Sequence, residues 1–281
     1  DLRLLKLLAG VLGRLGAMGA MANPGAIVDD LATTLRSELD FRNEAGAMER
    51  FAANLHTTDP RSRVVVPRPI AGLVSRRVLV MTFVHGTPID DIAALRAAGH
   101  DPEEILRCGV RAWVESALVH GEFHGDVHAG NLFVTPEGNV AMLDFGIIGH
   151  LDERTRTVVR DALMSVLVER DYEGAVGAII RLGVIPGRRL PDLRVAGAEV
   201  ASLVEPLLQS NLADISYGEV LAQVVRVATR YNARLPREFV LIIKQLIYIE
   251  RYSKELAPDY PILSDPSILM HLVGSQSQPT T

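Results

Sequence analysis

The chain has 281 residues, 48% of them hydrophobic, and a formal net charge of −5 at pH 7. This length and apolar content suffice for a sizeable core in one or two domains, and the negative charge argues against nucleic-acid binding, which needs a basic face. A single cysteine, Cys108, excludes an internal disulfide, which fits a reducing compartment. Its apolar neighbours predict core packing and not a nucleophile.

The most apolar stretch lies at residues 2–21, where Arg3, Lys6 and Arg14 interrupt the leucines. No run of about 18 uninterrupted apolar residues occurs, so the sequence predicts no transmembrane helix. A basic, leucine-rich helix in this stretch could lie at a membrane interface. Packing of that helix on the rest of the protein is the favoured alternative.

Asn23 and Pro24 resemble a helix start, and apolar residues then recur at helical spacing, which predicts a helix from about 25 to 54. On such a helix Asp40 and Glu44, four residues apart, share a face, while Glu38 lies on another. Two like charges at this spacing repel each other slightly. They therefore suggest a cationic partner or a metal, with a solvated helix face as the alternative.

Two strands are predicted at 64–66 and 78–83, and a helix begins at Asp101 and Pro102 with the signature of a capping box. The apolar residues of this helix form two adjacent stripes, which predicts that it is buried. It should end where the segment FHGDVHAGN begins. These elements therefore lead directly into the most informative part of the chain.

Asp126 is followed five residues later by Asn131, the spacing of a kinase catalytic loop, in which the aspartate faces the acceptor hydroxyl and the asparagine binds metal. Residues 132–143 then read as a β-hairpin with a turn at 136–139. The hairpin should return Asp144 to the side of Asn131. Asp144 begins a DFG tripeptide, whose carboxylate suits Mg2+. Together these residues predict a phosphoryl-transfer site.

The same segment allows two other interpretations. Asp126, Asn131 and Asp144 could be turn and cap residues, but that leaves their shared spacing unexplained. His120, His124 and His128 recur every four residues, as in some metal hydrolases. Intervening glycines would prevent the three rings from sharing a helical face, and no His-Glu-x-x-His pattern occurs. His124 is predicted to be structural, with its ring bonded to the loop backbone.

After DFG a helix is expected at once, from about 152 to 182, and no Ala-Pro-Glu follows. Protein kinases use the segment before Ala-Pro-Glu to dock a peptide, so its absence favours a small or lipid-like substrate over a protein. Further helices are predicted near 192–210, 216–233 and 236–256. The polar tail after Leu272 is predicted to be disordered.

The combination of ELDFRNEA, HGDVHAGN and LDFG resembles the UbiB/ADCK family of atypical kinase-like proteins, over about residues 1 to 257. The resemblance implies that Glu38 and Asp40 form the family's Glu-x-Asp motif and that Glu44 pairs with the ATP-binding lysine. It makes Asp126 the catalytic aspartate and Asn131 and Asp144 the metal ligands. It also implies that adenine meets the backbone at the residues of the hinge, Thr82, Phe83 and Val84.

The implied fold is α+β and mostly α: a protein-kinase-like fold with a truncated N-lobe at 1–85, a helical C-lobe at 86–257 and a tail at 258–281. The implied cofactors are ATP and Mg2+, and the implied partner is a small-molecule or isoprenoid-lipid substrate, as in ubiquinone biosynthesis. A cytoplasmic location is expected, with peripheral association at the inner face of the membrane as an alternative. A small-molecule phosphotransferase of the aminoglycoside or choline kinase type, and a non-catalytic pseudokinase-like regulator, are the other candidate functions.

The sequence departs from the family pattern in three respects. The KxGQ motif, the alanine-rich nucleotide loop and the ATP-binding lysine are not found, so the 281 residues are expected to be the C-terminal part of a longer protein. Lys6 is the nearest lysine, but its surroundings read as an amphipathic helix and not as a strand. Val127 and Ala129 stand where relatives often carry proline, which changes loop rigidity without removing a reacting group.

Overall fold

The computed structural model describes residues 40–58, 62–185, 190–209, 222–223, 226–227, 229–231, 233, 237–260 and 265. Its principal helices are α4 (Phe41–Thr58), α5 (Ile92–Ala97), α6 (Pro102–Glu115), α7 (Glu153–Met164), α8 (Tyr172–Arg181), α9 (Leu193–Gln209) and α11 (Arg237–Leu256). Its strands are β1 (Val64–Val65), β2 (Pro69–Val74), β3 (Leu79–Met81), β4 (Thr87–Pro88), β5 (Glu122–His124), β6 (Leu132–Val134), β7 (Val140–Met142) and β8 (Ile148–His150). The predicted N-terminal helix, most of the one at 216–233 and the tail apart from residues 258–260 and 265 lie outside the described residues.

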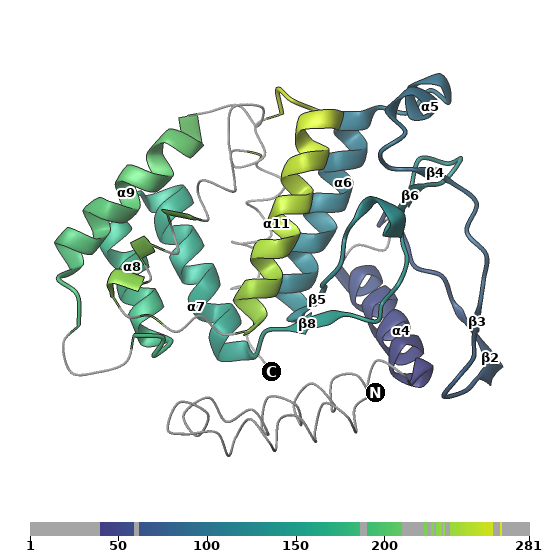
Figure 1. The fold of residues 1–281 in the computed structure, drawn as a ribbon, viewed down its shortest axis with the longest axis horizontal. Coiled ribbons are helices and arrows are strands. Elements are labelled where there is room, and N and C mark those ends of the chain that lie inside the picture. The colour runs from purple at the N-terminus through teal and green to yellow at the C-terminus, as the bar shows by residue number, and fades with distance from the viewer. Residues whose placement is uncertain are drawn as a thin grey trace, which may run out of the picture.

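The predicted β-hairpin is confirmed: β6 and β7 pair antiparallel, with Leu132 opposite Met142 and Val134 opposite Val140. They form the middle of a four-stranded sheet ordered β1-β7-β6-β4, in which β1 runs parallel to β7. Two further pairs, β2–β3 and β5–β8, were not fully predicted, since β2, β5 and β8 lack a clear alternating pattern. The strands are short, and the fold is mostly helical (Figure 1).

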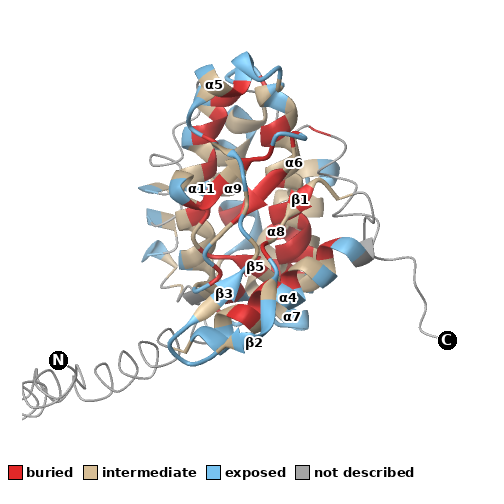
Figure 2. Ribbon diagram, turned by 90° about the vertical axis from the view of Figure 1, so that its right-hand side faces the viewer, coloured by how far each residue is buried: buried red, intermediate tan, exposed pale blue. Residues whose placement is uncertain are grey.

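Helices α6 and α11 lie side by side at the centre of the molecule, and the core runs along them (Figures 1 and 2). α6 begins where predicted, because the Asp101 side chain accepts a hydrogen bond from the Glu103 N–H. Both predicted apolar stripes are largely buried, including Ile105 and Trp113. Cys108 packs against this core as expected. A π-helical turn and left-handed Gly121 then end the helix just before β5.

The prediction of one continuous helix from 152 to 182 is wrong, because the chain reverses direction between α7 and α8. α7 ends in a π-helical turn at Ser165–Glu169, and Arg170 adopts a left-handed conformation with φ 56°. Asp171 then caps a new helix, α8, by accepting from the Gly174 N–H at 2.8 Å. α8 packs back on α7 and against α9, and the three helices lie to one side of α6 and α11 (Figure 1).

The helix that carries Glu44 begins at Phe41, so Asp40 precedes it and the two carboxylates do not share a continuous helix as predicted. The reason is local. The Asp40 carboxylate accepts from the backbone N–H of Arg42 at 3.2 Å, and the Arg42 guanidinium binds both carboxylate oxygens at 2.8 and 2.6 Å. These bonds hold Asp40 in the manner of a helix cap.

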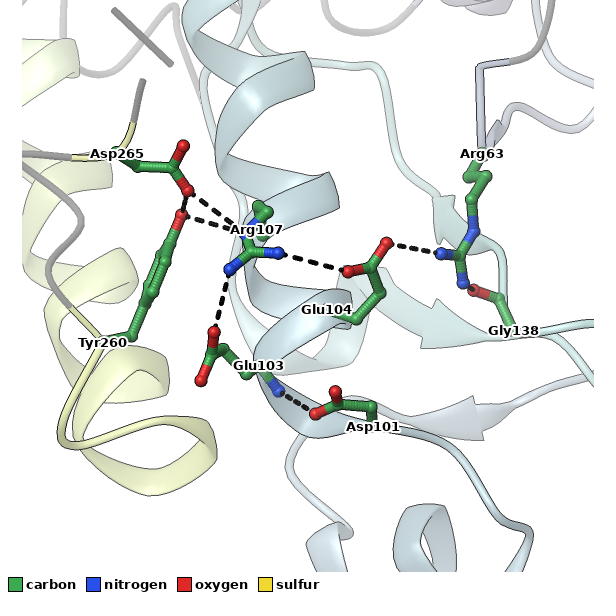
Figure 3. Close-up of polar contacts among 8 residues, drawn as sticks. All are labelled: Arg63, Asp101, Glu103, Glu104, Arg107, Gly138, Tyr260 and Asp265. Atoms are coloured by element: carbon green, nitrogen blue, oxygen red, sulfur yellow. Dashed lines mark hydrogen bonds and ion pairs between the residues drawn. The ribbon is translucent and has the colours of Figure 1, made fainter. Parts of the chain in front are cut away.

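A polar network around Arg107 ties α6 to distant parts of the chain (Figure 3). The Arg107 guanidinium binds Glu103 at 2.8 Å, Glu104 at 3.4 Å and Asp265 at 3.1 Å, and Asp265 also accepts from the hydroxyl of Tyr260. Glu104 in turn binds Arg63 at 2.9 Å. The network therefore connects the residues just before β1 and the segment after α11 to one turn of α6.

Two hydrophobic clusters can be distinguished among the described residues. The larger one combines α4, α6, α11 and the strands, and the smaller one, between α7 and α8, consists of Val158, Ala162, Ala175 and Ala178. Among the described helices, none combines the length and apolar content needed to cross a bilayer. The boundary at residue 85 remains a prediction, and β1, on its N-terminal side, pairs with β7 on the other.

Candidate active site

Asp126 lies in the loop between β5 and a short 3-10 turn at Ala129–Asn131. The Asn131 side chain is buried and donates from Nδ2 to the backbone carbonyl of Asp126 at 2.9 Å. Its amide oxygen is therefore the atom left for a ligand. His128 caps the turn by accepting from the Gly130 N–H. The predicted spacing of Asp126 and Asn131 thus corresponds to a direct contact between them.

The buried ring of His124 joins the two halves of the site. Its Nδ1 accepts from the Asp126 N–H at 3.1 Å, and its Nε2 lies 2.9 Å from the carbonyl oxygen of Leu143. Both contacts are satisfied by a neutral ring protonated at Nε2. Burial lowers the pKa of His124, which favours this neutral form. The prediction of a structural role is confirmed, and both ring nitrogens are engaged by backbone.

The β6–β7 hairpin returns the chain to Asn131, as predicted, because the Leu143 N–H donates to the Asn131 carbonyl at 2.8 Å. Asp144 follows in a left-handed conformation with φ 58°, which few residues other than glycine, asparagine and aspartate adopt readily. Its carboxylate accepts from the Gly146 N–H at 3.2 Å and is exposed. Asp144 therefore lies next in sequence to a residue that is bonded directly to Asn131.

Glu44 approaches this segment from α4. Its carboxylate accepts a hydrogen bond from the Phe145 N–H, while burial and the nearby charge of Asp144 raise its pKa. The Phe145 ring packs against Phe51 of α4, with the ring centroids 5.1 Å apart. A cavity opens between these elements, lined by Asp40, Asn43, Glu44, Ala47, Arg50, Phe145, Gly146, Ile148 and His150.

The other predicted site residues are placed less closely. Asp40 lines the same cavity, but the hydrogen bond from Arg42 lowers its pKa to about 2. Thr82, Phe83 and Val84 lie just after β3, where Thr82 exchanges hydrogen bonds with the backbone of Arg68. Phe83 is 81% exposed. Glu38 and Lys6 lie outside the described residues. Within the described part of the chain, Glu44 is the N-terminal acidic residue that accepts from the Phe145 N–H and lies near the charge of Asp144.

Two residues that contact the loop were missed by the sequence analysis. Lys244 of α11 forms an ion pair with Asp126, with 2.6 Å between Nζ and Oδ1, and Gln245 hydrogen-bonds the backbone on both sides of Asp126. The sequence does contain a signal for these residues. Lys244 and Gln245 interrupt an apolar run, with FVLII before them and LIYI after them. A polar residue on a buried helix face needs a partner. The pattern does not indicate which partner each side chain meets.

The donors present fit Mg2+, a hard cation that prefers oxygen ligands and keeps waters and phosphate oxygens in its shell. The Asn131 amide oxygen and the Asp144 carboxylate are such donors. Within the described part of the chain, no group of three or more His, Cys, Asp or Glu side chains is arranged to hold a metal. The contacts of His124 argue against the histidine-rich hydrolase site, because both of its ring nitrogens are already bonded to backbone.

Comparisons with known proteins found two matching family models and several similar chains. A model of the ABC1 atypical kinase-like domain matches residues 1–178, and a model of the UbiB helical domain matches residues 200–260. The chain is 39% identical over 242 residues to the uncharacterized protein Rv0647c of Mycobacterium tuberculosis, covering 86% of this chain and 49% of that protein. It is 30% identical over 273 residues to a probable protein kinase UbiB of Xylella fastidiosa, covering 93% and 48%.

A solved structure, that of Rv3197 of Mycobacterium tuberculosis in complex with erythromycin, shares the fold with a TM-score of 0.54 at 18% identity. The match covers 87% of this chain and 67% of that one. The prediction of a mostly helical, protein-kinase-like fold is therefore confirmed. The chain spans about half the length of the curated relatives that it matches.

Proposed function

The chain belongs to the ABC1 family of atypical kinase-like proteins, and from this premise we propose that Asp126 is the centre of a site for Mg2+-dependent phosphoryl transfer from ATP or for ATP hydrolysis. One observation carries the proposal: the side chain of Asn131 is bonded to the backbone of Asp126, and its own backbone is bonded to the residue before Asp144. Three residues from two segments are thereby held as one unit. Kinase-type chemistry needs this set.

The proposal gives each residue of this set a role. Asp126 orients the attacking hydroxyl or water and accepts its proton. Asn131 and Asp144 would hold Mg2+, which, bound to ATP, neutralises charge on the phosphates. His124 keeps the two segments in register through Asp126 and Leu143. Glu44, whose carboxylate reaches the Phe145 N–H, is positioned to pair with an ATP-binding lysine, and the hinge at Thr82, Phe83 and Val84 is where adenine would bind.

A small or lipid-like acceptor is supported by the segment after Gly146. There β8 pairs with β5, and α7 starts at Glu153, so little chain is left in which a peptide-docking segment could form. We propose an isoprenoid-like lipid as the acceptor or effector, in ubiquinone or related metabolism, as the resemblance to the UbiB/ADCK family implies. Action on such a lipid would bring a cytoplasmic protein to the inner face of the membrane.

The test is ATP turnover by the full-length gene product, with and without isoprenoid-like lipid, in the wild type and two variants. Asp126→Asn should lower kcat by about 100-fold or more while leaving nucleotide binding nearly intact. Asp144→Asn keeps a residue that tolerates the left-handed backbone. It should weaken binding of Mg-ATP much more than binding of ATP without metal, because it removes the charge of a metal ligand.

Normal turnover in the Asp126→Asn variant would exclude the proposed catalytic role. Equal weakening of both forms of ATP by Asp144→Asn would exclude it as a metal ligand. Tight nucleotide binding without turnover under every condition would favour a non-catalytic regulator. Turnover that is strongly stimulated by a polar small molecule and not by lipid would favour a phosphotransferase of the aminoglycoside or choline kinase type.

A further inference from the structure

Helix α11 meets the loop that carries Asp126 through three side chains on one helical face. Lys244 binds the Asp126 carboxylate, Gln245 binds the loop backbone, and the Tyr248 ring lies 6.2 Å from the ring of His128, centroid to centroid. The ammonium of Lys244 also lies 5.8 Å from the centre of the Tyr248 ring. This cluster comes from the part of the chain that matches a helical domain and not the kinase-like domain.

Gln245 fixes the backbone on both sides of Asp126. It is fully buried, its Oε1 accepts from the Val127 N–H at 2.9 Å, and its Nε2 donates to the Gly125 carbonyl. Proline at position 127 could not make the first bond, since it has no N–H. Buried amide groups that lose such partners are costly. These two bonds fix the position of α11 relative to the loop. The position of α11 in turn determines where Lys244 lies.

Lys244 differs from an ordinary surface ion-pair residue because the adjacent Gln245 is bonded to the loop. Exposed ion pairs contribute little, because their long side chains must be ordered. Here the Lys244 side chain is 42% exposed but that of Asp126 only 19%, and the neighbouring Gln245 anchors the backbone from which Lys244 extends. The lysine occupies Oδ1 of Asp126. The carboxylate thus keeps Oδ2 for another hydrogen bond, with the His128 ring 3.7 Å away.

We propose that Lys244 is a positioning residue of the active site, which holds the ionised carboxylate of Asp126 by Oδ1 so that Oδ2 faces the acceptor hydroxyl. The proposal rests on the proposed function and adds a residue from α11 to it. Ionised donor-acceptor pairs of this kind are short and directional. Because catalysis depends on placing the base within hydrogen-bond reach of the proton that it accepts, loss of the lysine should affect turnover more than nucleotide binding.

The experiment compares Lys244→Met and Lys244→Arg in the full-length gene product. Lys244→Met should lower kcat about 10- to 100-fold with the KM for ATP changed by less than about 3-fold, because misplacement of a reacting group costs rate and not binding. Lys244→Arg retains the charge and a carboxylate-binding geometry, and should recover most of the lost rate. The matched control is Lys254→Met, on the same helix, which removes a lysine ion-paired with Glu250 at 2.8 Å. It should leave kcat unchanged.

A second readout does not need turnover. Acetylation of lysines by a small amine-reactive reagent, followed by mass spectrometry, reports how strongly each ammonium is engaged. Asp126→Asn should increase the labelling of Lys244 and leave that of Lys254 unchanged. Unchanged labelling of Lys244 would overturn the ion pair whether or not ATP is consumed. If the wild type shows no turnover while Lys244 labelling responds, the proposed function fails and the contact with Asp126 stands.

Three kinetic outcomes would overturn the positioning role. Lys244→Met with normal kcat would mean that the ion pair is passive. A rise in KM at constant kcat would place Lys244 at the nucleotide and not at Asp126. A rise in kcat would mean that the lysine restrains Asp126. A Gln245→Met variant, assayed beside these, should lower kcat in parallel with Lys244→Met, and far-UV circular dichroism checks that each variant is folded.

Discussion

His124 shows how one buried side chain can hold two separate segments of a site together. Its ring bridges the Asp126 N–H and the Leu143 carbonyl, and this arrangement uses one donor and one acceptor nitrogen. A protonated ring would carry two donors and no acceptor, so the bond from Asp126 would be lost. The neutral form is therefore part of the structure of the site.

This makes stability depend on pH in a defined direction. Burial lowers the pKa of His124 in the folded protein, so the unfolded chain binds more protons at pH values below the unfolded pKa of about 6.5. The free energy of unfolding should fall as the pH drops below about 6.5, by at most about 1.4 kcal/mol per pH unit from this residue. His124→Gln, whose amide can make both contacts without titrating, should show a smaller fall.

Urea denaturation at about pH 7.5, 6.5 and 5.5 measures the effect. His85→Gln, which replaces an exposed histidine, is the matched control and should follow the wild type. If His124→Gln and the wild type lose stability in parallel, the neutral ring is not what stabilises the loop.

At the scale of secondary-structure elements, the pairing of β5 with β8 places Phe123 directly opposite Gly149. The Phe123 ring is fully buried, and a Cβ added at Gly149 would lie 2.1 Å from its Cζ atom. Because the ring packs against Trp113 with centroids 5.6 Å apart, it has little room to move. The strand that leads into the Asp126 loop thus depends on glycine in its partner.

Gly149→Ala should therefore lower the free energy of unfolding by about 1–3 kcal/mol, the usual cost of overpacking a core. Gly109→Ala is the control. Its added Cβ would meet Val140 at an ordinary 3.9 Å, and alanine in a helix should raise stability by about 0.5–1 kcal/mol. Chemical denaturation of both variants provides the comparison. An unchanged Gly149→Ala protein would mean that the two strands separate easily.

At the scale of the whole molecule, the two hydrophobic clusters differ greatly in the apolar surface that they bury. The larger cluster includes aromatic and long aliphatic side chains from α4, α6 and α11, whereas the one between α7 and α8 consists mainly of alanines. α9 contributes the buried Ala196 and the partly buried Leu207 but leaves Leu193 and Val195 exposed. Regions with few buried apolar contacts open locally at low free energy.

Amide hydrogen exchange should accordingly be faster in α8 and α9 than in α6 and α11. Mass spectrometry of peptides from the exchanged protein resolves these helices. A second expectation is that the fluorescence of Trp113, the only tryptophan, changes after the first loss of helical signal in a urea titration, because it lies in the larger cluster. Equal protection of all four helices would show that the molecule opens as one unit.

Much of this architecture could be predicted from local signals. The spacing of Asp126 and Asn131, the turn before Val140 and the cap at Asp101 each act within a few residues, and the structure confirms the elements that they predict. The break in the helix at Arg170 was missed, although Asp171 is a typical N-cap residue. Apolar periodicity continues across that break, so the pattern alone favoured one long helix.

The site residues that could not be predicted from the sequence are those whose partners lie far away in the chain. Lys244 and Gln245 reach a loop 118 to 120 residues before them, and nothing in a helical pattern indicates which loop a half-buried lysine or a buried glutamine will meet. Asp40 was misplaced for a different reason. Its bonds to Arg42 compete with the helix that periodicity predicts, and such local side-chain bonds favour a cap over a continued helix.

The two bonds from Gln245 to the backbone around Asp126 also have a consequence during synthesis on the ribosome. The loop around Asp126 emerges first, and its partner in α11 is added 118 residues later, about 6 to 24 s at ordinary rates of translation. A nascent or prematurely terminated chain can contain every residue of the kinase-like motifs and still lack the helix that aligns them. If the proposed function holds, incomplete copies of this protein would therefore lack the helix contact that aligns Asp126.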